Sequence, residues 1–164
     1  MIITTWNCNL KLKSKYEFIE SLDSDILIIQ ECEKLKQDYF SNNQYFWTGR
    51  DENKGLGVLV KKDTANVSKL HNSNFIHFLP IETDSLNIMG VWAFNHRAVK
   101  YGDNANGRTL DAINYYDVWL KDSQKSIFAG DFNNSIIWDK KSNPSFSNIN
   151  NKLSLLGYES SYHK

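Results

Sequence analysis

The chain has 164 residues, the length of a single domain, and residues 1–164 are treated as one domain. Hydrophobic residues make up 41% and charged residues 23%, which is the composition of an ordinary globular protein. The 19 Lys and Arg residues balance the 19 Asp and Glu residues, which excludes the broad positive field of a nonspecific DNA clamp.

The N-terminal part of the chain alternates strand, helix and strand. Residues 1–9, "MIITTWNCN", are rich in β-branched side chains and predict a first strand. Residues 13–22 carry apolar side chains at a spacing of three, which predicts a short amphipathic helix. Residues 25–31, "DILIIQE", form a continuous apolar run of strand length, so we expect both faces of that strand to be covered.

The middle of the chain is a run of strands. Four segments there are rich in β-branched and aromatic residues: 44–50, 56–62, 74–83 and 86–96.

The last third of the chain returns to helix and strand. Residues 108–121 predict a helix with one apolar face, which is made of Leu110, Ile113, Tyr116 and Leu120. Residues 125–131 predict a short buried strand, and residues 147–158 predict a helix that ends at Gly157. The order of all these elements predicts a layered α/β domain with mixed sheets in the core and helices outside.

Four of the apolar runs end in an unusual group of polar residues. These are Asn7 and Asn9, Gln30 and Glu31, Asn95 and His96, and Asp131 and Asn133. In α/β sheets, ligands gather at the carboxyl ends of the strands, because the loops there converge over one edge. Carboxylate and amide oxygens, together with water, are the ligands of Mg²⁺ or Mn²⁺. Zinc fits poorly, because no Cys/His set has its spacing.

The four endings, "WNCN", "IIQE", "NH" and "GDFN", resemble the motifs of the endonuclease/exonuclease/phosphatase superfamily. This superfamily holds metal-dependent enzymes that include DNase I-like and abasic-site nucleases. The order and rough spacing agree over the whole chain, and "GDFN" is the strongest single signal. "GDFNNSIIWDKK" and "GYESSYH" further resemble bacterial members. The resemblance implies a two-sheet α/β sandwich of the DNase I-like type.

The resemblance also implies a role for each site residue. Glu31 would be the main Mg²⁺ ligand, and Asn7 a metal-adjacent or phosphate-orienting amide. His96 would stabilise the phosphate in the transition state. Asp131 would activate the attacking water, and Asn133 would orient that water or the phosphate. A simple turn explains the residue types after Gly130, but it does not explain why three other strands end the same way.

Several other residues have two open interpretations. Trp138 has a loop-like setting and either stacks on a nucleic-acid base or packs in the core. Arg97, Lys100 and Arg108 flank the loop after the histidine motif and either contact phosphates or are solvated surface charges, of which the second is favoured.

The sequence departs from the superfamily at its C-terminal end. The resemblance implies a late Asp-His pair, but the chain stops at "SSYHK", and His163 follows a Tyr. Strands of the core sheets would also follow residue 164. We therefore expect a C-terminally truncated domain, either a fragment or a naturally short form, that alone is weakly active and marginally stable. A partner chain or segment would supply the missing strands.

The cysteine content and the N-terminus bear on location. Cys8 and Cys32 belong to no CxxC or Cys/His cluster, which indicates a reducing compartment and two buried, inert thiols. The N-terminus lacks the features of a signal peptide, and no apolar run approaches the ~20 residues that cross a bilayer. We expect a cytoplasmic protein that does not associate with membranes.

The sequence thus favours a Mg²⁺-dependent phosphodiester hydrolase of the nuclease type, with nucleic acid or another phosphodiester as substrate. Two alternatives stay open. One is a phosphatase that acts on a small phosphorylated molecule or lipid head group. The other is a noncatalytic remnant that binds a partner or nucleic acid.

Overall fold

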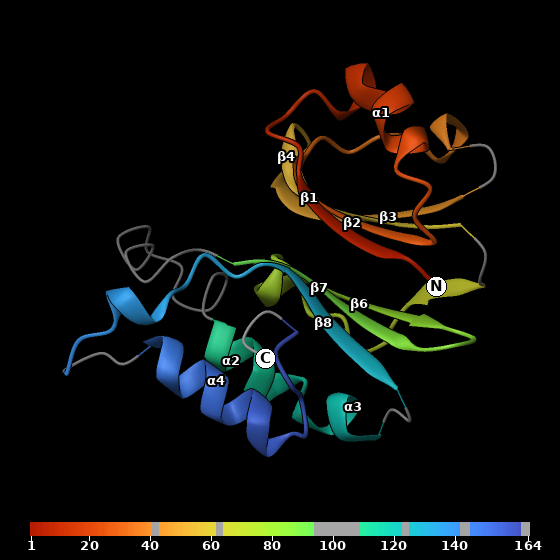
Figure 1. Cartoon of the computed structure of the whole chain (residues 1–164). Helices are drawn as coiled ribbons and strands as arrows, with labels where there is room; N and C mark the ends of the chain where they lie inside the picture. Colours follow the sequence, from red (N-terminus) through yellow and green to blue (C-terminus); the bar gives the residue numbers. More distant parts are fainter. Residues whose placement is uncertain (41–42, 62–63, 94–108, 123–124, 142–144, 162–164) are drawn as a thin grey trace.

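The computed structural model of the chain is a sandwich of two four-stranded sheets with helices on its outer faces (Figure 1). It describes residues 1–40, 43–61, 64–93, 109–122, 125–141 and 145–161. The first sheet has the order β1 (Ile3–Asn7), β2 (Ile26–Cys32), β4 (Lys54–Val60), β3 (Gln44–Asp51). The second has the order β5 (Ala65–Val67), β6 (Phe78–Thr83), β7 (Asn87–Trp92), β8 (Ser126–Asp131). The predicted two-sheet α/β sandwich is confirmed.

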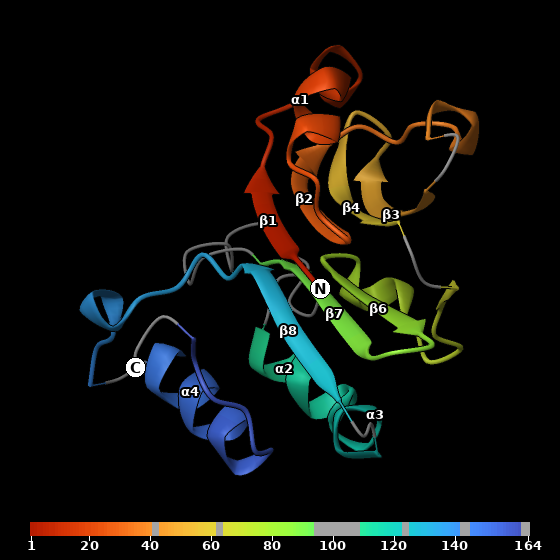
Figure 2. The same ribbon diagram turned by 45° about the vertical axis from the view of Figure 1, so that its right-hand side comes forward.

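The strand directions bring the carboxyl ends of four strands to one side of the sandwich. β1 is parallel to β2, and β7 is parallel to β8, whereas the other pairs are antiparallel. β1 and β2 also contact β8 across the sandwich. In both views β1 and β8 run toward the same side of the molecule (Figures 1 and 2). The polar endings of these strands therefore lie at one edge.

The core follows the two-residue period of the strands. In β2, Ile26 and Ile28 belong to the cluster between the sheets, whereas Leu27 and Ile29 pack in the cluster under α1 (Tyr16–Ser21). The expectation that both faces of β2 are covered is confirmed. The outer face of the second sheet is covered by α2 (Thr109–Tyr115), α3 (Asp117–Asp122) and α4 (Ser145–Leu155) (Figure 1).

Short 3-10 helices complete the described elements: η1 (Leu12–Lys15), η2 (Gln37–Tyr39), η3 (Ser73–Phe75) and η5 (Ile136–Trp138). Among the helices of the described ranges, none is long and apolar enough to cross a membrane. The cytoplasmic location stays a prediction.

Two predicted strands need correction. The strand predicted over 74–83 begins only at Phe78, because the Asn72 side chain accepts from the Asn74 backbone N–H and caps η3. The strand predicted over 86–96 ends at Trp92. His96 and Asn95 lie outside the described residues.

Three further differences concern burial and continuity. The helix predicted over 108–121 is two helices that meet at Tyr116. The predicted apolar face packs against the core, with Ile113, Tyr116 and Leu120 buried and Leu110 partly buried. β8 is half-buried, not buried, because it is the outer strand of its sheet in the described part of the chain. β5 was not predicted, since three residues are too few to show a period.

Candidate active site

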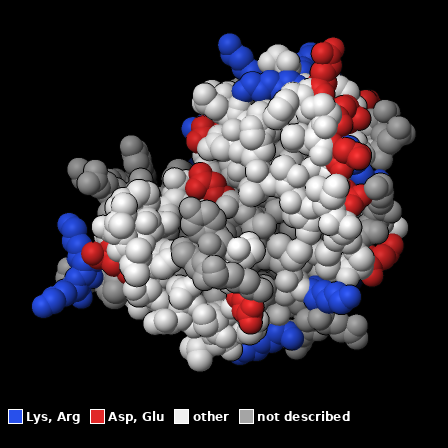
Figure 3. Space-filling view, in the orientation of Figure 1, with Lys and Arg blue, Asp and Glu red and all other residues white. Residues whose placement is uncertain are grey.

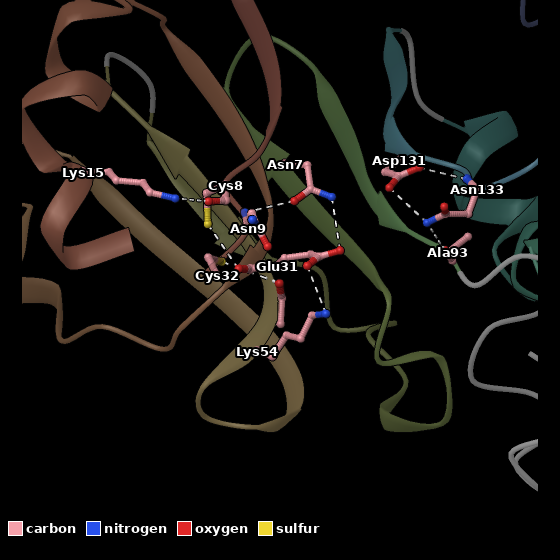
Figure 4. Close-up of polar contacts among 11 residues, drawn as sticks. Asn7, Cys8, Asn9, Lys15, Glu31, Cys32, Lys54, Ala93, Asp131 and Asn133 are labelled. Carbon is pink, nitrogen blue, oxygen red and sulfur yellow. Dashed lines mark hydrogen bonds and ion pairs between the residues drawn. The ribbon is translucent and has the colours of Figure 1, made fainter. Parts of the chain in front are cut away.

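The carboxyl end of β1 holds Asn7 against the end of β2. Asn7 Nδ2 donates to Glu31 Oε1 over 3.3 Å, and Asn7 Oδ1 accepts from the Asn9 backbone N–H over 3.0 Å (Figure 4). A backbone N–H can only donate, so this second bond fixes which end of the Asn7 amide faces Glu31. The structure therefore brings together the two residues that the sequence predicted as the metal end of the site.

A β-bulge aims Glu31 out of β2. The pairing of β2 with β4 shifts between Gln30 and Cys32, and Glu31 between them has a positive φ of 56°. Its carbonyl is anchored by the Leu10 N–H at 2.8 Å and by the Cys8 thiol at 3.2 Å. Bulges re-aim side chains, and a non-glycine residue held at positive φ stores strain that recurs at functional sites. The Glu31 side chain is 23% exposed, so a ligand can reach it at the sheet edge.

Lys54 pairs with the same carboxylate from the start of β4. Its Nζ lies 3.0 Å from Glu31 Oε2 and 5.4 Å from the centre of the Trp92 ring. No sequence motif indicated Lys54 or Trp92 as part of the site. The available signal was that Lys54 opens the apolar run "GLGVLV". An antiparallel partner of β2 that begins there places Lys54 beside the end of β2.

The carboxyl end of β8 forms a second polar group. Asp131 Oδ1 accepts from the Asn133 backbone N–H and Oδ2 from Asn133 Nδ2, both over 3.0 Å. Asn133 Nδ2 also donates to the Ala93 carbonyl over 2.8 Å. Both hydrogens of the Asn133 amide are therefore directed to Asp131 and Ala93, and the residue holds the Asp131 carboxylate in place. The first of these bonds is the Asx turn that the residue types favour.

Gly130 makes this corner possible. Its φ is +142°, and a Cβ there would lie 2.0 Å from the Val91 carbonyl oxygen. No side chain fits in that space, so only glycine lets β8 approach β7 closely before Asp131.

Trp92 connects the two polar groups. It pairs with Asp131 in the register of β7 and β8, and its ring lies under the Lys54 ammonium. It is 6% exposed and belongs to the cluster between the sheets. Figure 4 draws the Asn7–Glu31–Lys54 group on the first sheet and the Asp131–Asn133 group at the end of β8, which contacts β1 and β2 across the sandwich. Trp92 therefore lies beside Asp131 in the sheet, while its ring supports Lys54.

His77 packs edge-on against Trp92, with ring centroids 5.0 Å apart at 85°. Burial, and to a smaller extent the positive charge of Arg50, lower the pKa of His77 to about 4. The imidazole is therefore neutral at physiological pH and is part of the support under the site.

The other predicted residues have separate outcomes. Cys8 and Cys32 are buried, as expected, and burial raises the pKa of their thiols to about 11 and about 12, which keeps them protonated. Trp138 is 41% exposed in η5, so the core-packing alternative is wrong. His96 and the basic residues 97, 100 and 108 lie outside the described residues, and their roles stay predictions.

The donor set fits a hard divalent cation. Among the described residues, no three His, Cys, Asp or Glu side chains group closely enough to hold a metal. Mg²⁺, however, keeps several waters and is bound through one or two carboxylates together with substrate phosphates. Glu31 supplies one partly exposed carboxylate, and the Asn7 amide oxygen keeps a second lone pair. The residues fit such a site, with Lys54 as the group that a cation must displace.

The charge distribution agrees with a local site. On the face shown in Figure 3, charged side chains of the described residues are scattered and form no broad basic patch. A phosphate-bearing ligand is then met by a few specific groups and not by a general field.

Comparison with solved structures identifies the fold. A 3′-5′ exonuclease (NExo) from Neisseria meningitidis is 18% identical with a TM-score of 0.66, over 93% of this chain and 71% of that one. The 3′ phosphatase NExo from Neisseria bound to product DNA hairpin is 18% identical with a TM-score of 0.63, over 92% and 70%. An AP endonuclease from Archaeoglobus fulgidus is 14% identical with a TM-score of 0.61, over 94% and 71%. No protein-family model matches the chain, and the search of curated proteins found no match.

These likenesses establish the DNase I-like α/β sandwich as the fold of the chain. The DNase I-like fold that the motif resemblance implied is confirmed. The chain spans about 70% of the length of these structures.

Proposed function

We propose that the chain is a divalent-cation-dependent phosphoester hydrolase that acts on nucleic acid. One observation carries this proposal: two polar groups from different sheets, Asn7–Glu31 and Asp131–Asn133, lie at the ends of strands that contact each other across the sandwich. The fold is common to structures described as exonuclease, phosphatase and endonuclease, which supports hydrolysis of a phosphoester.

The residues of the chain would divide the work between the two groups. Glu31, oriented by Asn7, would hold Mg²⁺ or Mn²⁺, which when bound neutralises charge that develops on phosphoryl oxygens. Asp131 would take a proton from the water that attacks phosphorus as the bond to the leaving oxygen breaks. Each Asp131 oxygen accepts one bond from Asn133 and keeps a lone pair for that water. His96 keeps its predicted role at the phosphate.

Nucleic acid is favoured as substrate by the segment that follows Asn133. In η5, Ile136, Ile137 and Trp138 are exposed at 62%, 80% and 41%. An exposed indole close in sequence to the catalytic group suits stacking on a base, which is how single strands are bound without sequence preference. A solved structure of the same fold is described as bound to product DNA hairpin, which supports the same substrate class.

The test is hydrolysis of four substrates by the purified chain: single-stranded DNA, duplex DNA, bis-p-nitrophenyl phosphate and p-nitrophenyl phosphate. Each is assayed with Mg²⁺, with Mn²⁺ and with a chelator. We expect metal-dependent cleavage of the oligonucleotides, which Glu31→Gln abolishes. The matched control is Glu52→Gln, which removes one carboxylate that is 77% exposed and paired with Lys34.

The outcomes separate the alternatives. Turnover of the monoester alone would favour the small-molecule phosphatase. No turnover of any substrate, with intact folding, would favour the noncatalytic alternative. Equal affinity of wild type and Glu31→Gln for Mg²⁺ in calorimetry would remove Glu31 from the metal site.

A further inference from the structure

Lys54 occupies the one carboxylate oxygen of Glu31 that Asn7 leaves open. Asn7 Nδ2 contacts Oε1, and Lys54 Nζ contacts Oε2 at 3.0 Å. The side chains of Glu31 and Lys54 are 23% and 44% exposed, so this pair is less exposed than the Lys34–Glu52 pair at 52% and 77%. A cation that binds Glu31 must therefore compete with an ammonium that already neutralises the carboxylate.

The Lys54 ammonium has a second support that does not depend on Glu31. It lies 5.4 Å from the centre of the Trp92 ring, and Trp92 is paired with Asp131 at the other end of the site. Once displaced from Glu31, the lysine stem can stay on the ring, because this contact uses the face of the indole. The ammonium is then a point charge with three donors beside Glu31 and on the Trp92 ring, which suits a phosphate oxygen.

We infer that Lys54 is an exchangeable counter-cation: it neutralises Glu31 until a divalent cation takes that oxygen, and then binds a phosphate group of the substrate. Lys54 is thus a positioning residue that couples cation binding to phosphate binding. The roles in cation binding and substrate binding rest on the proposed function, whereas the exchange of Lys54 between Glu31 and a phosphate ion does not.

The coupling has a defined sign. While Glu31 and Lys54 are paired, the divalent cation binds more weakly than it would to an unpaired Glu31. Phosphate likewise binds more weakly than it would to an unpaired Lys54. Displacement by one ligand favours the other, and the effect is reciprocal because binding free energies are linked. Removal of Lys54 should therefore strengthen binding of the divalent cation to Glu31. Removal of the Glu31 charge should likewise strengthen binding of phosphate to Lys54.

A second ion pair of the chain provides a matched control. Lys34 Nζ lies 2.9 Å from Glu52 Oε1 and 5.9 Å from the centre of the Trp47 ring, so it makes the same two kinds of contact. Its side chains are 52% and 77% exposed, and neither belongs to the candidate site. Lys34→Met changes the net charge as Lys54→Met does.

The experiment measures binding by calorimetry with two probes, Mg²⁺ and inorganic phosphate in the presence of a chelator. The variants are Lys54→Met, Lys34→Met, Glu31→Gln and the double variant Glu31→Gln/Lys54→Met. Methionine keeps an unbranched apolar stem on the Trp92 ring, and circular dichroism with thermal melting checks the fold of each variant.

We expect Lys54→Met to bind Mg²⁺ about threefold to tenfold more tightly than wild type, and Lys34→Met to bind it as wild type does. We expect Glu31→Gln to bind phosphate several-fold more tightly without any metal, and the double variant to lose that gain. Unchanged or weaker Mg²⁺ binding by Lys54→Met would overturn the inference. So would a phosphate gain that persists in the double variant, since it would come from net charge alone. Should no variant bind Mg²⁺, the proposed function fails, and the phosphate measurements alone decide the role of Lys54.

Discussion

The two ends of the candidate site differ in how their carboxylates are held. Glu31 on the first sheet contacts two side chains, Asn7 and Lys54, and one of these contacts is an ion pair that another cation can replace. Asp131 on the second sheet is held by the backbone and side chain of Asn133, which is itself tied to the Ala93 carbonyl. The first end is arranged to exchange its partner, and the second is arranged to keep one geometry.

This difference matches two chemical tasks. A metal ligand has to accept a cation that comes and goes, so its resting partner must be replaceable. A carboxylate that takes a proton from water has to stay aligned during the reaction, because preorganisation supplies much of the rate. The comparison therefore predicts that substitutions at the second sheet act on structure or on rate, whereas those at the first act on binding.

The largest expected effect is loss of the corner before Asp131. Gly130→Ala should lower the free energy of unfolding by about 3–5 kcal/mol, because the new Cβ meets the Val91 carbonyl in a strained backbone conformation. Chemical denaturation of wild type and Gly130→Ala measures this change in the free energy of unfolding. Gly157→Ala is the control: φ there is +86° with nothing within 4 Å, so about 1–2 kcal/mol should be lost. Similar losses at the two glycines would contradict the close packing at Gly130.

The next effect is on rate. Asp131→Asn keeps the shape of the side chain but removes the proton acceptor, so kcat for oligonucleotide cleavage should fall about 10²–10³-fold. The free energy of unfolding should fall by only about 1–3 kcal/mol, because an asparagine oxygen still accepts from the Asn133 backbone N–H, whereas the bond from Asn133 Nδ2 is lost. A parallel collapse of the melting temperature would show that Asp131 is structural and would remove the distinction between the two ends.

The smallest effect tests the aromatic support under Lys54, where His77 packs against Trp92. His77 has a pKa of about 4 in the folded chain against an ordinary value of 6.5, so the unfolded chain binds the proton more readily. The contribution of neutral His77 to the free energy of unfolding is fully present above pH 6.5 and is lost as the pH falls toward 4. The loss amounts to about 2–3 kcal/mol. Urea unfolding at pH 7 and pH 4.5 should show a steeper loss in wild type than in His77→Phe. Equal losses would place the acid sensitivity elsewhere.

The sequence predicted four of the residues that the structure brings together because of where they lie in their strands. Asn7, Glu31, Asp131 and Asn133 each lie at or just after the end of an apolar run, and parallel pairing makes such ends meet. Lys54 opens a strand 23 positions after Glu31, and its contact depends on antiparallel pairing and on a bulge that no local pattern reveals.

The same limit applies to the helices and to β5. The face of Leu110, Ile113, Tyr116 and Leu120 was predicted because burial follows the 3.6-residue period. The break between α2 and α3 at Tyr116 was not predicted, because it leaves the 3.6-residue period unchanged. β5 is defined by its pairing with β6, and its own three residues carry no signal. The predicted truncation, its low activity and its weak stability stay predictions.

The central claim is that the two sheet ends form one catalytic unit, and a double-mutant cycle on turnover tests it most directly. The rate of Mg²⁺-dependent cleavage of a labelled oligonucleotide is measured for wild type, Glu31→Gln, Asp131→Asn and the double variant. Groups that act together fail together, so we predict that the double variant is within about tenfold of the slower single variant. Two losses that multiply in full, or a wild-type rate in either single variant, would contradict the claim.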